Sequence, residues 1–212
     1  MTSITKLAVI ATTAAAVPLS FIRAPYPEEL VIQHVPTLLG LAAFAMVVVF
    51  AKPSRLTFAC VLAFFWIHIL GARWIYSFVP YDDVLRSIAG TTTSELFGWQ
   101  RNHYDRFVHF SSGLLGVPPV SEILQRCGGM RSRGAAIMSI SAVLAIGSLY
   151  EIFEWQIAVT LAPDQAEAYN GQQGDIWDPQ KDLALAAFGA VISAILVSLW
   201  VPPSMKPTVA PT

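Results

Sequence analysis

The chain has 212 residues, of which 55% are hydrophobic and only 13% are charged, and its mean hydropathy is +0.56. Water-soluble chains of this length rarely carry such values, so the composition indicates a polytopic membrane protein and argues against an ordinary soluble domain. A net charge of −1 without a basic face also argues against nucleic-acid binding.

Six uncharged stretches follow one another along the chain. At about 1.5 Å per residue, most can cross a hydrocarbon core of about 30 Å, and the shorter ones can extend through flanking polar residues. Backbone polar groups in lipid must be paired internally, so we expect an all-α bundle of about six transmembrane helices in a single integral-membrane domain. The predicted helices are 7–22, 34–51, 56–72, 106–124, 134–160 and 183–202.

The first predicted helix and the long polar connections each have their own interpretation. The first stretch, 7–22, could also be a cleaved secretory signal with Lys6 as its basic end. Its apolar run between Lys6 and Arg23 is 16 residues, longer than the usual signal core, which favours a retained helix. The longest polar connections, about 73–105 and 163–182, are expected to be loops.

The distribution of basic residues gives an orientation. With the amino terminus inside, the inner positions hold seven bases and one acid, and the outer positions hold six bases and 13 acids. The assignment of the inner side depends mainly on the short basic loop between Arg126 and Arg133 and on Lys52 and Arg55 beside helix ends. Both termini are therefore expected to be cytoplasmic. Cys60 and Cys127 then lie toward the reducing side, and we expect free thiols.

Polar residues from four separate segments meet near the outer membrane level in this topology. They lie at the outer end of the third helix, the outer start of the fourth, about 26–30 Å up the fifth, and just before the sixth. The candidate constellation is His68, His103, Asp105, His109, Glu151, Glu154, Asp175, Asp178 and Asp182.

Helical spacing indicates which of these residues share a face. Residues three or four apart do so, and this applies to Asp105 with His109, to Glu151 with Glu154, and to Asp178 with Asp182. So many carboxylates need counter-charge. The side chains of Arg73, Arg101, Arg106 and Lys181 could supply it, or a divalent metal such as zinc, manganese or iron could.

Simpler interpretations stay open for several of these residues. Asp178 and Asp182 could be first-turn acids at the positive end of a helix dipole. His68 and His109 could be helix-packing histidines. Glu151 resists such a reading, because an acid after 17 uncharged residues is costly unless it is paired or functional.

Two further expectations concern residues outside the constellation. His34 is interpreted as a helix-end residue without a chemical role. Gly113 and Gly189, with other small residues, are expected to permit close helix packing.

Four motifs in fixed order resemble the YjdF-like family of bacterial inner-membrane proteins, whose domain has no known function. They are "H..GARW.YS.VPY", "RNHYDRFVHF..G", "YE..EW" and "G.QGD.WD.QKD...A..GA", and the resemblance covers about residues 35 to 200. The last motif is also weakly similar to the end of VanZ-like membrane proteins. The resemblance implies a fold and an inner-membrane location, but no activity. The family's characteristic polar residues would be His68, Tyr76, Asn102, Asp105, Arg106, His109, Glu151, Glu154, Gly174, Asp175, Trp177, Asp178 and Asp182.

Three function classes remain. The first is a metal-dependent membrane hydrolase acting on a lipid or lipid-linked substrate, with Glu151 or Glu154 as general base and Arg106 or Arg73 holding an anionic head group. Its expected metal ligands are drawn from His68, Asp105, His109, Asp175, Asp178 and Asp182. The second is a structural or partner-binding membrane protein, and the third is a proton- or cation-coupled transporter. Motifs of serine hydrolases, zinc proteases and phosphate-binding loops are absent from the sequence.

Overall fold

The computed structural model describes residues 1–161 and 166–200. All regular structure in these residues is helical, which confirms the all-α prediction for this part of the chain. The long helices are α1 (Ser3–Ser20), α2 (Pro27–Phe50), α3 (Arg55–Ala72), α6 (Tyr104–Arg126), α7 (Ser132–Leu161) and α9 (Asp178–Trp200). The short helices are α4 (Tyr81–Ala89), α5 (Thr93–Phe97) and α8 (Ala166–Tyr169).

Five of the long helices are long and apolar enough to cross a membrane, and α6 is the long helix outside this set. Its first turns carry Asp105, Arg106 and His109, and its last turns carry Glu122 and Arg126. It packs against α3, α7 and α9, so protein surrounds much of its surface. Such enclosure is the arrangement that a polar helix requires inside a membrane protein.

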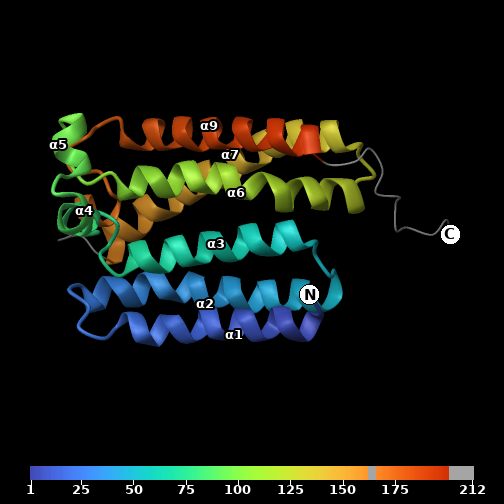
Figure 1. Ribbon diagram of the computed structural model, residues 1–212, viewed down its shortest axis with the longest axis horizontal. Helices are drawn as coiled ribbons and strands as arrows, with labels where there is room; N and C mark the ends of the chain where they lie inside the picture. The colour runs from blue at the N-terminus through green and yellow to red at the C-terminus, as the bar shows by residue number, and fades with distance from the viewer. Residues whose placement is uncertain (162–165, 201–212) are drawn as a thin grey trace.

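The long helices form two groups of three. Helices α1, α2 and α3 pack against one another, as do α6, α7 and α9, and the main contact between the groups is α3 against α6 (Figure 1). Successive long helices run in opposite directions. The start of α1 therefore lies at one end of the bundle, called here the terminal end, and α4 and α5 lie at the other, called the α4 end (Figure 1).

Segment 73–105 is more ordered than the predicted loop, because it contains α4 and α5. The hydroxyl of Thr92 accepts a hydrogen bond from the Glu95 backbone N–H, and the Glu95 carboxylate accepts one from the Thr92 backbone N–H. This reciprocal cap starts α5. Asp82 of α4 accepts from the backbone N–H of Thr93 at 2.9 Å, which ties the two short helices together. Capping thus produces helices where no long apolar run predicts them.

The long helices begin before their predicted starts, and the difference is largest for α2 and α9. Helix α2 begins at Pro27 rather than residue 34, and α9 begins at Asp178 rather than residue 183. Each has proline within its first two positions, where the missing N–H costs nothing, and acids in its first turn, where the helix dipole favours them. Asp182 consequently lies inside α9, one turn from its start.

Glycines set the distance between α6 and α9. A Cβ atom on Gly113 would lie 1.9 Å from the Ala186 carbonyl oxygen, and one on Gly189 would lie 2.2 Å from the Phe110 carbonyl oxygen. The two backbones therefore touch, which confirms the predicted packing role of Gly113 and Gly189. Both cysteines are free, as expected.

Replacing Gly113 by alanine should lower the melting temperature in detergent strongly. The added methyl group meets backbone rather than a movable side chain, so the cost should reach or exceed the about 1–3 kcal/mol typical of overpacking. Gly134→Ala is the matched control, because its Cβ would meet only the end of Met130 at 3.6 Å. Equal melting temperatures for the two variants would contradict the backbone contact described above.

Candidate functional site

A buried group of acids surrounds one histidine at the α4 end of the bundle. His109 of α6 has its Nε2 atom 3.3 Å from Glu151 Oε1 of α7 and 3.7 Å from Asp105 Oδ1, one turn earlier on α6. Potential ligand atoms of Asp105, His109 and Asp182 lie within 4.8 Å of one another, and so do those of His109, Glu151 and Glu154. These five residues are called the acid–histidine cluster.

Three helices position this cluster. The i,i+4 spacing on α6 places Asp105 and His109 on one face, and the i,i+3 spacing on α7 does the same for Glu151 and Glu154. Because α6 contacts both α7 and α9, Asp182 can approach the same point from α9. Asp105 and Asp182 are only 4% and 2% exposed, so they lie in the protein interior.

A layer of ion pairs lies beside the cluster. Arg101 Nη1 donates to Asp178 Oδ1 at 2.6 Å, and Lys181 Nζ donates to Asp175 Oδ2 at 2.6 Å. Arg106 donates to Asp175 as well, and one of its nitrogens lies 3.4 Å from Asp178 Oδ1. The hydrogen bond from Lys181 is the main reason that the pKa of Asp175 falls to about 2. Asp175 and Asp178 are thus matched by cations.

The segment before α9 covers the cluster. Arg101 donates to the carbonyl oxygens of Gly171 and Gln172, which holds this segment against the start of α6. Gly171 has a φ of +71°, and a Cβ there would lie 2.4 Å from Asp105 Oδ2. Both its conformation and its closeness to the carboxylate require glycine.

Carboxylates outnumber cations in this region. Six carboxylates (Asp105, Glu151, Glu154, Asp175, Asp178, Asp182) and three bases (Arg101, Arg106, Lys181) leave an excess of three negative charges when all are ionised. Among the described residues, Asp105 Oδ2, Glu151 Oε1 and Asp182 Oδ1 are buried without a hydrogen-bond partner, as is Asp178 Oδ2. His109 Nε2 lies 3.3 Å from Glu151 Oε1, but the two atoms form no hydrogen bond. Buried carboxylates of this kind must bind protons or a cation.

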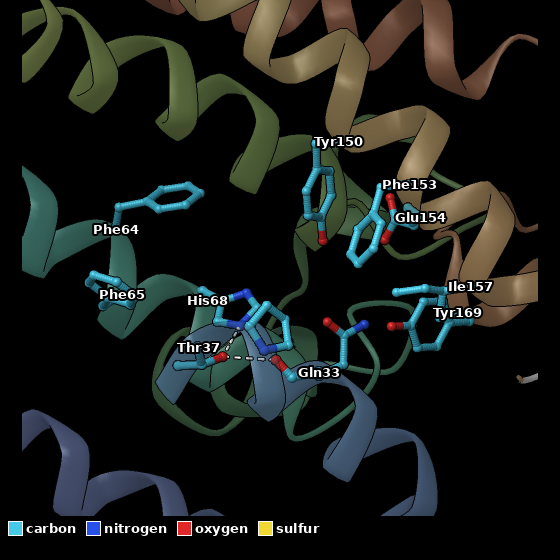
Figure 2. A pocket seen from close by; sticks show the side chains of 11 residues that line it. Gln33, Thr37, Phe64, Phe65, His68, Tyr150, Phe153, Glu154, Ile157 and Tyr169 are labelled. Atoms are coloured by element: carbon cyan, nitrogen blue, oxygen red, sulfur yellow. Dashed lines mark hydrogen bonds between the residues drawn. The ribbon is translucent and has the colours of Figure 1, made fainter. Parts of the chain in front are cut away.

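His68 lies outside both potential ligand groups. Its Nε2 is 2.6 Å from Thr37 Oγ1, and its Nδ1 bonds to the Tyr76 hydroxyl. The Thr37 hydroxyl donates its proton to the Gln33 carbonyl oxygen at 2.8 Å, so it must accept from His68 Nε2–H (Figure 2). Nδ1 of His68 then accepts from Tyr76, and both ring nitrogens are engaged.

A strained turn after α3 brings Tyr76 to His68. Ile75 and Tyr76 have φ values of +43° and +58°, a conformation unfavourable for both residues and especially for a β-branched one. A Cβ on Gly71 would lie 2.7 Å from the Tyr76 ring, so that glycine makes room for it. Both Ile75 and Tyr76 are buried. This strained turn directs the Tyr76 side chain toward His68 in the polar interior.

His34 differs from the sequence interpretation. It lies inside α2 rather than at a helix end, it is 2% exposed, and its Nε2 is 2.8 Å from the Ser20 hydroxyl. Its Nδ1 is 3.4 Å from Thr37 Oγ1, which extends the polar chain of His68 into α1. The signal that could have revealed this chain is the i,i+3 and i,i+4 spacing of Gln33, His34 and Thr37 within an apolar stretch.

The predicted site residues do not form a single group. His68, Asp105 and His109 line one cavity of about 390 Å³, whereas Asp175 and Asp178 belong to the ion-pair layer. The His103 ring stacks on Trp99 at 4.1 Å, and burial, with smaller effects of Arg106 and Arg101, lowers its pKa to about 4. The candidate constellation is thus divided into a cluster, an ion-pair layer and a hydrogen-bonded chain, and His103 lies outside all three.

The apolar helices and the enclosed polar helix define a polytopic helical membrane protein with a buried acidic site. The chain belongs to the family described as "Predicted membrane protein (DUF2238)", whose model matches residues 5–202. It is 34% identical over 132 residues to inner membrane protein YjdF of Escherichia coli (strain K12), across 61% of this chain and 58% of that protein. The match thus spans less than two thirds of the relative's length, and no solved structure matches the chain significantly.

These findings confirm the predicted YjdF-like family and the predicted location in a bacterial inner membrane. Neither match describes a molecular activity.

Proposed function

We propose that the acid–histidine cluster binds a divalent metal ion and that the protein is a membrane hydrolase for a lipid or lipid-linked substrate. The observation that carries the proposal is the set of unpartnered carboxylate oxygens on Asp105, Glu151 and Asp182 around His109. A metal ion would satisfy several of these oxygens together and reduce the excess negative charge. One imidazole with carboxylates suits zinc, manganese or iron.

The proposed roles follow from burial and position. Asp105, His109 and Asp182 are all buried and are assigned as metal ligands. Glu151, which is less buried, is assigned as general base, with Glu154 beside it. The water oxygen would form the new bond to the carbonyl or phosphoryl centre, and the bond from that centre to the alkoxide oxygen would break. One proton of the water would pass to Glu151 and then to the departing alkoxide.

Arg106 receives a different role from the one expected from sequence. Its guanidinium group already contacts Asp175 and Asp178, so binding an anionic head group would require it to leave them. The proposal therefore assigns Arg106 to hold the start of α9 in place, which positions Asp182.

Transport is less well supported. The acid on the far part of α6, Glu122, accepts from the backbone N–H of Ser54 at 2.9 Å and pairs with Arg126 at 2.7 Å. It thus holds Ser54, the N-cap residue of α3, in place at the terminal end. Between Asp105 and Glu122, the cavity beside α6 is lined mainly by apolar residues. The described residues therefore provide no continuous polar path along α6.

The metal content of detergent-purified protein tests the proposal. We expect about one bound divalent ion per chain, and loss of most of it in His109→Ala and Asp182→Asn. His103→Ala and Asp83→Asn are matched controls, because both residues lie at the α4 end outside the cluster and should leave the metal content unchanged. Melting temperatures measured alongside identify unfolded variants. Folded His109→Ala protein with undiminished metal, or wild type without metal after loading, would refute the proposal in favour of a scaffold role.

The proposal places the cluster on the outer side of the membrane, with both termini cytoplasmic, on the basis of the basic residues at the terminal end. Native Cys127 is exposed, whereas Cys60 is buried. A membrane-impermeant maleimide should therefore leave Cys127 unlabelled in right-side-out vesicles and label it after permeabilisation. Leu96→Cys in a Cys127→Ser background is the control at the α4 end, and it should react without permeabilisation. The reverse pattern would move the cluster to the cytosolic side.

A further inference from the structure

The two groups of helices leave a crevice between them where α3 and α7 face each other. It consists of two adjoining cavities, of about 390 Å³ and about 150 Å³, which share Phe64, Phe65, His68 and Tyr150. The larger lies between α3, α6 and α7, and the smaller lies between α2, α3, α7 and α8. Figure 2 shows the smaller cavity, with side chains of α7 on one side and those of α2 and α3 on the other.

The crevice changes from polar to apolar along its length. At the α4 end it is lined by polar groups that include Asp105, His109 and Tyr76. Toward the terminal end its lining becomes apolar, with Val143 on α7 and Val120 on α6. From Asp105 to Val120 an α-helix rises about 22 Å, which is most of a hydrocarbon core of about 30 Å. This is the polarity profile of a membrane amphiphile.

The crevice also reaches the lipid-facing surface. Ile146 and Phe153 line it and are 60% and 51% exposed, so it is open to the side between α3 and α7. Water is a poor occupant of an apolar cavity, and at this depth the surrounding molecules are lipids. A hydrocarbon chain can therefore enter without crossing a polar barrier.

An unpartnered donor marks where a polar head would lie. The Gln33 amide nitrogen is buried without a hydrogen-bond partner among the described residues, and Gln33 is only 2% exposed. In Figure 2 its amide extends into the space between His68 and Tyr169. A buried donor of this kind requires an acceptor, such as a carbonyl or phosphate oxygen.

We propose that the crevice binds the hydrocarbon chain of one membrane amphiphile, which enters between α3 and α7 and places its polar head between Gln33 and the acid–histidine cluster. The identification of this amphiphile as the substrate rests on the proposed function. Chain binding itself does not.

Photolabelling of the full chain tests the inference. The protein is reconstituted into vesicles of phosphatidylethanolamine and phosphatidylglycerol that contain a small fraction of phospholipid with a diazirine in one acyl chain. We expect adducts to concentrate on crevice residues such as Phe64, Val143 and Tyr150. Ile146→Trp should fill the opening and reduce these adducts several-fold. Ile152→Trp is the matched control on the same helix, because Ile152 is similarly exposed but does not line the crevice.

Further variants keep the test decisive. If Ile146→Trp fails to fold, Ser112→Leu narrows the larger cavity from α6 and should have the same effect. Gln33→Met, which removes only the amide, should also weaken crevice labelling. Adducts spread evenly over the lipid-facing surface, or unchanged by Ile146→Trp, would overturn the proposal.

Metal content measured on the same preparations separates this inference from the proposed function. Scattered adducts on metal-loaded protein would support the metal site and refute chain binding in the crevice. Concentrated adducts on metal-free protein would establish chain binding while the hydrolase proposal fails.

Discussion

The backbone contact between α6 and α9 is the constraint on which the site depends. Gly113 and Gly189 let the two helices touch, and this brings Asp182 of α9 toward Asp105 and His109 of α6. Any larger residue at these glycines would separate the helices and move carboxylates away from the imidazole. The packing of small residues in the interior therefore determines the chemistry that the α4 end can perform.

The cluster and the ion-pair layer differ in how their negative charges are balanced. Arg101 and its neighbouring cations neutralise the acids at the start of α9 and hold the covering segment in place. Beyond this layer, the acids around His109 form no ion pair with a lysine or arginine among the described residues, and some of their oxygens lack hydrogen-bond partners there. A scaffold alone would gain little from such an arrangement, because unpaired buried carboxylates destabilise the folded state. Binding of a cation or of protons to these carboxylates would remove this destabilisation.

Much of this arrangement follows from local patterns in the sequence. Apolar length predicts the long helices, and i,i+3 or i,i+4 spacing places Asp105 with His109 and Glu151 with Glu154. What the spacing cannot predict is which helices are neighbours, and so it could not separate His68 from the cluster. That separation depends on Thr37 of α2, which lies far away in the sequence. Likewise, hydropathy predicts that a helix begins at its apolar run. A proline and an acid in the first turn instead allow α9 to begin before that run.

X-ray absorption spectroscopy of metal-loaded protein tests the central claim most directly, because it reports the atoms bound to the metal. With zinc or manganese bound, the account predicts a first shell of oxygen atoms and one imidazole nitrogen, and loss of the imidazole signal in His109→Ala. Additional oxygens would come from Asp105, Asp182 and water. A shell that contains sulfur from Cys60 or Cys127, or one that is unchanged in His109→Ala, would contradict it.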